Sequence, residues 1–105
     1  MSPTDVKSST ITSSGRVESY TGSGSYIARA RLFAVNANPS AAEAVNKNNH
    51  GTSAVAASNV FQVNFGSAAE TDGLDIYIPQ NGILCPAGIY VALTNCDSCT
   101  LVWQA

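Results

Sequence analysis

Residues 74–104, which read LDIYIPQNGILCPAGIYVALTNCDSCTLVWQ, decide the fold of this chain. In residues 89–94, Ile, Val and Leu alternate with other residues, and the same period of two returns in residues 99–104. This period is typical of strands with one face more buried than the other, and it places Cys99, Leu101 and Trp103 on one face. The turn-forming residues 95–98 between the two runs indicate an antiparallel hairpin.

A third strand is predicted directly upstream, at residues 74–78. Leu74, Ile76 and Ile78 point to one side, and Pro79 ends the strand because proline cannot donate to a β-ladder. Residues 80–82, Gln-Asn-Gly, supply the turn chemistry that lets the chain reverse. The last third of the chain is therefore predicted as three strands with short connections.

Composition favours one small domain whose surface contacts other protein. The chain has 105 residues, which suffice for a single modest core. Charged residues make up only 11%, where about 25% is usual, and Ser, Thr, Asn, Gln and Ala cover the surface in their place. Since a free monomer normally stays dispersed through a mixed, charged surface, this shortage indicates a surface that lies against protein.

Charge and hydropathy argue against nucleic acid and membrane as partners. The net charge is −2, and the five basic residues form no cluster of the kind that marks nucleic-acid binding. The apolar runs are far shorter than the roughly 20 residues that span a bilayer. The N-terminus has no apolar core of a signal peptide, so folding is expected where the chain is made. The odd number of cysteines, three, fits that expectation.

Upstream of the C-terminal third, the sequence predicts an arm and further strands. Residues 1–15 are rich in Ser and Thr and carry too little apolar surface to order alone, which predicts a flexible N-terminal arm. Residues 16–105 form the β domain. Further strands are predicted at residues 16–20, 26–35 and 60–65.

The alternation within these strands predicts which side chains face the core. In residues 26–35, the small-residue face is Ala28, Ala30, Leu32 and Ala34. A helix competes for that segment because Ala and Leu are good helix formers. In residues 60–65, the predicted core residues are Phe61, Val63 and Phe65.

Residues 37–59 give the weakest strand signal. Ser40 as N-cap and Glu43 as its capping-box partner predict one short helical turn. The following residues 46–53, NKNNHGTS, are predicted to form a polar loop, and a loop of this length is more often an interaction element or a disordered tip than packing. Together these features predict an all-β fold: a small single-domain antiparallel β-sandwich or barrel with a flexible N-terminal arm.

Cysteine and histidine offer no metal or redox site. Cys96 and Cys99 form one CxxC, but the other donors, Cys85 and His50, stand at no spacing known for zinc. A redox CxxC precedes a helix in an α/β fold, whereas this one flanks a predicted turn. The three cysteines are therefore expected to be reduced and free of metal. His50 is expected to be a solvated loop residue.

Acidic residues and glycines carry no recognisable chemistry either. Glu70, Asp72 and Asp75 lack the spacing of a calcium loop, and Gly22 and Gly24 form only a fragment of a dinucleotide motif. The sequence contains no nucleophile elbow, no paired catalytic carboxylates and no phosphate-binding loop. The sequence therefore predicts a protein that is not an enzyme, with no catalytic, cofactor-binding or metal-binding residues.

The order of motifs in residues 74–104, a strand closing on Ile-Pro, then Asn-Gly, a Gly-Ile-Tyr strand and a final hairpin, resembles the end of small bacteriophage virion proteins. The resemblance covers the last third of the chain and extends to Gly15, Arg16 and Val17. It implies a capsid decoration (cement) protein that binds the major capsid protein on the outer head surface as a homo-oligomer, most simply a trimer. Such a protein is made in the host cytoplasm and located on the virion.

Other functions remain open at this point. Within the virion, the chain would otherwise be a tail, neck or fibre-attachment component, and the longer connection at residues 37–59 departs from the decoration pattern. Outside the virion, a carbohydrate-binding β-module or a small enzyme is the alternative. Sugar binding needs exposed rings, whereas Tyr90 and Trp103 lie in predicted strands, where a core or interface role is expected.

Overall fold

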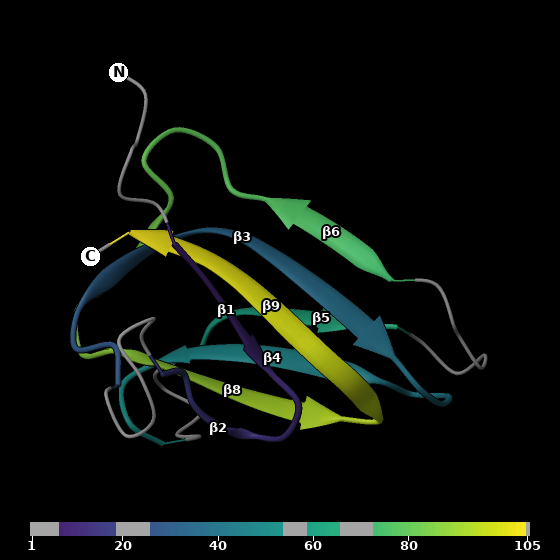
Figure 1. The fold of residues 1–105 in the computed structure, drawn as a ribbon. Coiled ribbons are helices and arrows are strands. Elements are labelled where there is room, and N and C mark those ends of the chain that lie inside the picture. The colour runs from purple at the N-terminus through teal and green to yellow at the C-terminus, as the bar shows by residue number, and fades with distance from the viewer. Residues whose placement is uncertain (1–6, 19–25, 54–58, 66–72, 105) are drawn as a thin grey trace.

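The computed structural model describes residues 7–18, 26–53, 59–65 and 73–104, and these residues form two antiparallel β-sheets without any helix (Figure 1). This confirms the predicted all-β domain. The strands are β1 (Lys7–Ile11), β2 (Gly15–Arg16), β3 (Ala30–Pro39), β4 (Val45–His50), β5 (Asn59–Asn64), β6 (Leu74–Tyr77), β7 (Ile83–Cys85), β8 (Ile89–Thr94) and β9 (Cys96–Gln104).

The order of the strands is that of a jelly roll. Sheet A has the order β1-β9-β3-β6, with β7 also paired to β3, and sheet B has the order β2-β8-β4-β5. Both β6 and β7 run antiparallel to β3, at Ala34–Ala37 and Ala30–Leu32, so they are two halves of one interrupted strand. Counting them as one gives eight strands in two four-stranded sheets, as in jelly rolls. Of the described strands, only β4 and β5 are consecutive strands that pair with each other.

The connection between β8 and β9 crosses from one sheet to the other. Asn95 alone joins Thr94 to Cys96, with a φ of 53°, and its carbonyl accepts a hydrogen bond from the Ser40 N–H at 2.7 Å. The predicted hairpin between residues 89–94 and 99–104 is therefore wrong, although both runs are strands. Asn is one of the few residues that adopts a positive φ at low cost, which makes this sharp crossover possible.

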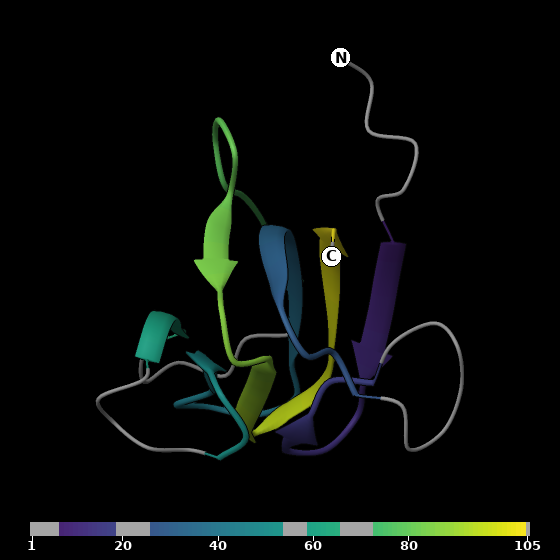
Figure 2. The same cartoon turned by 90° about the vertical axis from the view of Figure 1, so that its left-hand side faces the viewer.

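Residues 79–82 do not reverse the chain, because β6 and β7 on either side of them pair with β3 in the same direction. They form an excursion from an otherwise continuous strand, visible as the green loop at the top of Figures 1 and 2. Gly82 has a φ of 70°, and a Cβ there would lie 2.5 Å from the Leu32 carbonyl oxygen. The predicted turn residues are thus correct, but the predicted change of direction is wrong.

The Asn-rich segment after β3 is a central strand, not a polar loop. Residues 40–44 form a turn in which Glu43 has a φ of 57°, so the predicted helical turn is wrong. β4 follows and pairs with β5 on one side and β8 on the other. Asn is a poor strand former, but two flanking ladders outweigh the local preference, since strand propensity depends strongly on context.

The N-terminal arm prediction is wrong for the residues of β1. β1 pairs with β9 along its whole length, from Lys7 opposite Trp103 to Ile11 opposite Cys99. β2 likewise pairs with β8. The pairing supplies the hydrogen bonds and the apolar contacts that residues 1–15 lack alone. Residues 1–6 and residues 19–25, which include part of the predicted strand 16–20, lie outside the described residues.

A β-bulge changes which side of β3 faces the core. The register with β9 shifts between Leu32 and Ala34. Ala30 and Leu32 are buried before the shift, and Val35 and Ala37 are buried after it. The predicted inner face is therefore correct for Ala30 and Leu32, whereas Ala34 lies on the outer face because a bulge inserts one residue into the alternation.

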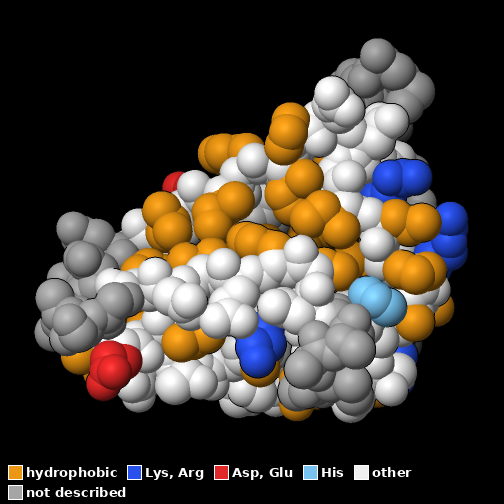
Figure 3. Space-filling view, turned by 180° about the vertical axis from the view of Figure 1, so that it is seen from behind, with side chains coloured by type: hydrophobic (Ala, Val, Ile, Leu, Met, Phe, Trp, Pro, Cys, Tyr) orange, Lys and Arg blue, Asp and Glu red, His pale blue; other side chains and the backbone are white. Residues whose placement is uncertain are grey.

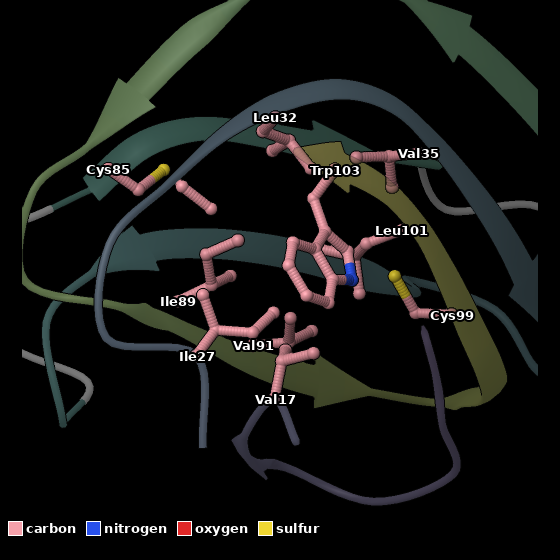
Figure 4. Close-up of a cluster of buried hydrophobic side chains, with 11 residues drawn as sticks. Val17, Ile27, Leu32, Val35, Cys85, Ile89, Val91, Cys99, Leu101 and Trp103 are labelled. Carbon is pink, nitrogen blue, oxygen red and sulfur yellow. The ribbon is translucent and has the colours of Figure 1, made fainter. Parts of the chain in front are cut away.

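Trp103 lies at the centre of the core. Its ring is 2% exposed and lies between the two sheets, with Val17 and Val91 on the sheet B side (Figure 4). The indole Nε1 donates a hydrogen bond to Ser9 Oγ at 2.9 Å, and Ser9 Oγ donates in turn to the Glu18 carbonyl at 2.8 Å. The buried cluster consists of Val17, Ile27, Ala30, Leu32, Val35, Cys85, Ile89, Val91, Cys99, Leu101 and Trp103.

The hydrogen bond from Trp103 predicts the effect of two neighbouring substitutions in β1. Ser9→Ala leaves the Trp103 N–H without its acceptor, which should lower the free energy of unfolding by about 1–3 kcal/mol. Ser8→Ala is the control because Ser8 is exposed on the other side of the same strand, and it should change stability by less than about 0.5 kcal/mol. Urea denaturation of both variants measures this. Equal losses would show that the bond to Ser9 is unimportant.

Candidate functional site

The three cysteines are free thiols that belong to the packing. Cys85 and Cys99 are fully buried, and Cys96 is partly buried. Burial raises the pKa of both Cys85 and Cys99 to about 11, and for Cys99 the nearby Asn46 amide opposes that rise. The pKa of Cys96 is also raised, mainly by burial. These thiols are therefore protonated at neutral pH, when a nucleophile or a metal ligand would need to be a thiolate.

The other residues considered as sites also lie apart from one another. His50 ends β4 opposite Ile89, so it is a half-buried strand residue and not a solvated loop residue. Asp75 lies on β6 and accepts a hydrogen bond from Asn36 Nδ2 at 2.6 Å. Among the described residues, no three His, Cys, Asp or Glu side chains come together in a way that would hold a metal ion. The other four candidates, Gly22, Gly24, Glu70 and Asp72, lie outside the described residues.

Two asparagines of β4 form a polar pair inside the sandwich. Asn46 and Asn48 are fully buried, and Asn48 Nδ2 donates to Asn46 Oδ1 at 2.6 Å. The pairing places Asn46 beside Leu93 and Val63, and Asn48 beside Val91. Asn48 Oδ1 has no hydrogen-bond partner among the described residues, and Asn46 Nδ2 has none there beyond its weak interaction with the Cys99 thiol. Unpaired amide groups in an apolar core destabilise the fold, so this pair is a structural weakness of sheet B.

The outer face of sheet A presents mostly neutral side chains beside the carboxylate of Asp75. Thr10 Oγ1 and Thr100 Oγ1 share a hydrogen bond of 2.8 Å across β1 and β9. Asn36 continues this row on β3 and donates to Asp75, while Asn38 Nδ2 donates to Asn36 Oδ1 at 2.8 Å. Hydrogen bonds between neighbouring side chains hold these groups in place. The face therefore presents fixed polar groups at low charge.

Tyr77 is the most exposed large apolar side chain on this face. It is 79% exposed, at the end of β6 and opposite Ala34. Beside it is a shallow groove of about 90 Å³, which is small compared with the roughly 300–1,000 Å³ of small-molecule sites. The groove is lined by Ala34, Val35, Asn36, Asp75, Ile76, Tyr77, Thr100 and Val102.

The apolar surface continues around the edge of the sandwich. Figure 3, which views the molecule from behind, shows hydrophobic side chains gathered in a broad central band. β6 and β5, the edge strands of sheets A and B, lie on this side of the molecule (Figures 1 and 2). Leu74 on β6 is 39% exposed, and Val60 and Phe61 on β5 are partly buried. Large exposed apolar patches mark sites of interaction with other molecules.

The aromatic residues that were considered for sugar binding are not the exposed ones. Trp103 is in the core, and Tyr90 is half-buried opposite Arg16. Among the described residues, the exposed rings are those of Tyr77 and Tyr26, and the Tyr26 ring stacks under the Arg16 guanidinium at 4.5 Å. Sequence reasoning did not single out Tyr77. Its signal was the alternation of residues 74–78, which puts Tyr77 on the face opposite Ile76.

Comparisons with models of protein families, with curated proteins and with solved structures gave no match to this chain. The described residues include no helix that is long and apolar enough to cross a membrane. The outer face of sheet A, with Tyr77 at its edge, is therefore the candidate functional site on structural grounds alone.

The raised pKa values of Cys85 and Cys99 predict a loss of stability in alkaline solution. Between pH 9, where thiols of the unfolded chain ionise, and pH 11, the folded chain keeps protons that the unfolded chain releases. Each thiol should therefore stabilise the fold below pH 9 and lose this contribution, about 2–3 kcal/mol, by pH 11. Urea denaturation of the wild type and of C85A/C99A should show a shallower decline in the variant. Parallel pH profiles would contradict the prediction.

The buried asparagine pair predicts opposite effects of single and double substitution. Asn48→Val removes the donor to Asn46 Oδ1 and leaves that buried acceptor unpaired, which should cost about 1–3 kcal/mol. The double variant N46V/N48V removes both amides and adds residues with high strand propensity, so it should be at least as stable as the wild type. Denaturation midpoints of the two variants decide this. A double variant less stable than the wild type would contradict it.

Proposed function

We propose that this chain is a non-enzymatic structural protein of a bacteriophage virion, a capsid decoration (cement) protein. It binds the major capsid protein on the outer surface of the head as a homotrimer and stabilises the shell. The observation that carries this proposal is the outer face of sheet A, which combines fixed uncharged polar groups with the 79% exposed ring of Tyr77.

That face has the properties of a protein-contact surface. Interface centres are depleted in charge and enriched in Tyr, Trp and Phe, and aromatic residues are frequent among the few that carry most binding energy. On the outer face, the carboxylate of Asp75 is already engaged with Asn36. A partner that covers this surface would have to leave the Asp75 carboxylate in water or supply a cation, because a neutral amide does not compensate a buried charge.

Two further observations support the virion assignment. The jelly-roll strand order occurs in viral capsid domains and also in lectins, so the fold alone does not separate these functions. The resemblance of residues 74–104 to phage virion proteins favours the first of them. A shell with many identical positions also lets a trimer bind through modest contacts, since the second and third contacts become intramolecular.

Carbohydrate binding is the second candidate because one observation favours it. Tyr77 presents an exposed ring beside a shallow groove that contains Asn36, Asp75 and Thr100. An aromatic platform with neighbouring hydrogen-bonding groups suits a sugar ring. The groove beside Tyr77 would then hold a single sugar residue.

The attachment of purified protein to heads tests the proposal. Heads assembled from the major capsid protein of the phage that encodes this chain should bind many copies per particle, as measured by co-sedimentation and quantitative mass spectrometry. Heads that lack the protein should assemble but release their genome at a lower temperature. Tyr77→Ser should weaken binding at least about tenfold, whereas Tyr26→Ser, which removes an exposed ring elsewhere, should bind like the wild type.

Other outcomes identify the alternatives. A few copies per particle, located at the tail or neck by electron microscopy, would contradict the decoration role and favour a tail, neck or fibre-attachment component. Binding to a glycan array that is lost in Tyr77→Ser, with no binding to heads, would favour the carbohydrate-binding module.

A further inference from the structure

Among the described residues, four exposed charged side chains lie at the two ends of the β3–β9 pair according to sign; the other described charged residues are Lys7, Arg16, Glu18, Lys47 and Asp75. Arg29 and Arg31 stand at the start of β3, and Arg31 lies opposite Gln104 at the end of β9. Glu43 follows the other end of β3, and Asp97 is the second residue of β9. Because β3 and β9 are antiparallel and pair from Arg31 to Pro39, the two groups lie roughly 25 Å apart.

The basic end, Arg29 and Arg31, borders a cleft. The cleft has a volume of about 270 Å³ and is lined by Arg29, Ala30, Arg31 and Gln104. Both arginines are exposed, and Arg31 Nη1 donates to the Asn81 carbonyl at 3.3 Å. That bond uses one of the five guanidinium N–H donors and leaves the others for a carboxylate.

The acidic end, Glu43 and Asp97, is held together by the turn that follows β3. The Ser40 N–H donates to the Asn95 carbonyl at 2.7 Å, and Asn95 Nδ2 donates to the Ala42 carbonyl at 2.9 Å. These bonds fix the turn against the start of β9, so both exposed carboxylates border the same end. Figure 3 shows Asp and Glu side chains toward the left of the molecule, and Lys and Arg side chains toward its right-hand end and also in its lower middle.

We infer that the basic end of one copy receives the acidic end of a second copy of this chain. This inference rests on the homotrimer of the proposed function and identifies its subunit contact. The basic end carries two exposed positive charges and the acidic end carries two exposed negative charges, so a contact between the basic end of one copy and the acidic end of another is complementary. A contact of either end with itself would oppose like charges, which is unfavourable. A contact between two different surfaces also closes into a ring when its rotation allows.

In this contact the charges determine orientation and not affinity. Exposed ion pairs contribute little stability each, so Arg29, Arg31, Glu43 and Asp97 set the orientation of the subunits and exclude other arrangements. The affinity comes from the uncharged surface that the oriented copies bury between them. Reversing the charges should therefore change assembly more than it changes the stability of a single subunit.

Charge reversal and charge exchange test the inference without any capsid. R29E/R31E makes both ends acidic, and E43K/D97K makes both ends basic. Either variant should weaken self-association at least about tenfold relative to the wild type, as measured by analytical ultracentrifugation. The exchanged variant R29E/R31E/E43K/D97K has the wild-type net charge and should form trimers again. Lys47→Glu, on β4 between the two ends, is the control and should remain trimeric.

Three results would overturn the inference: a monomeric wild type, reversed variants that stay trimeric, or an exchanged variant that is folded by circular dichroism but remains monomeric. Reversed variants that stay trimeric but no longer bind heads would show that the ends contact the capsid protein. Head binding by the wild type is measured separately, so attachment to the head is confirmed or refuted whatever this contact proves to be.

Discussion

The antiparallel pairing of β3 with β9 is the constraint on which the rest of the fold depends. It joins residues 30–39 to residues 96–104, and every other strand of sheet A pairs with one of these two. Because β8 precedes β9 by the single residue Asn95, the same pairing also fixes where sheet B lies. Bringing such distant segments together costs chain entropy, and only burial of apolar surface in the completed core offsets that cost. Trp103 on β9, which is buried between the two sheets, contributes to this burial.

The sequence predicts the strands of this fold better than their partners. The alternation of Cys99, Leu101 and Trp103 identifies a buried face because a period of two is a local property. Whether a strand pairs with its neighbour or crosses to the other sheet is not local: β8 and β9 show the pattern of a hairpin but belong to different sheets. β4 was missed for a related reason. Asn46 and Asn48 contradict strand propensity, and only the ladders on both sides make the segment a strand.

The candidate site depends on non-local placement even more than the strands do. The alternation in residues 74–78 contains the information that Tyr77 faces away from Ile76, but only the pairing of β6 with β3 shows that this face is the outer one. Likewise, Arg31 and Gln104 are far apart in the sequence and become neighbours at one end of the β3–β9 pair, while Glu43 and Asp97 come to its other end. Composition alone showed that charges are scarce. It did not show that four of those charges lie at opposite ends of the β3–β9 pair according to sign.

This separation gives the low charge content a physical interpretation. Burial of apolar and neutral polar surface is favourable but hardly directional, so a subunit with uncharged faces would associate in many orientations. Charged pairs cost little when they remain at the rim of a contact, and they discriminate strongly between orientations. Few charges suffice for that purpose if they lie at the ends of the molecule, as Arg29, Arg31, Glu43 and Asp97 do. In the proposed homo-oligomer, the uncharged faces therefore favour association, and the charged ends restrict its geometry.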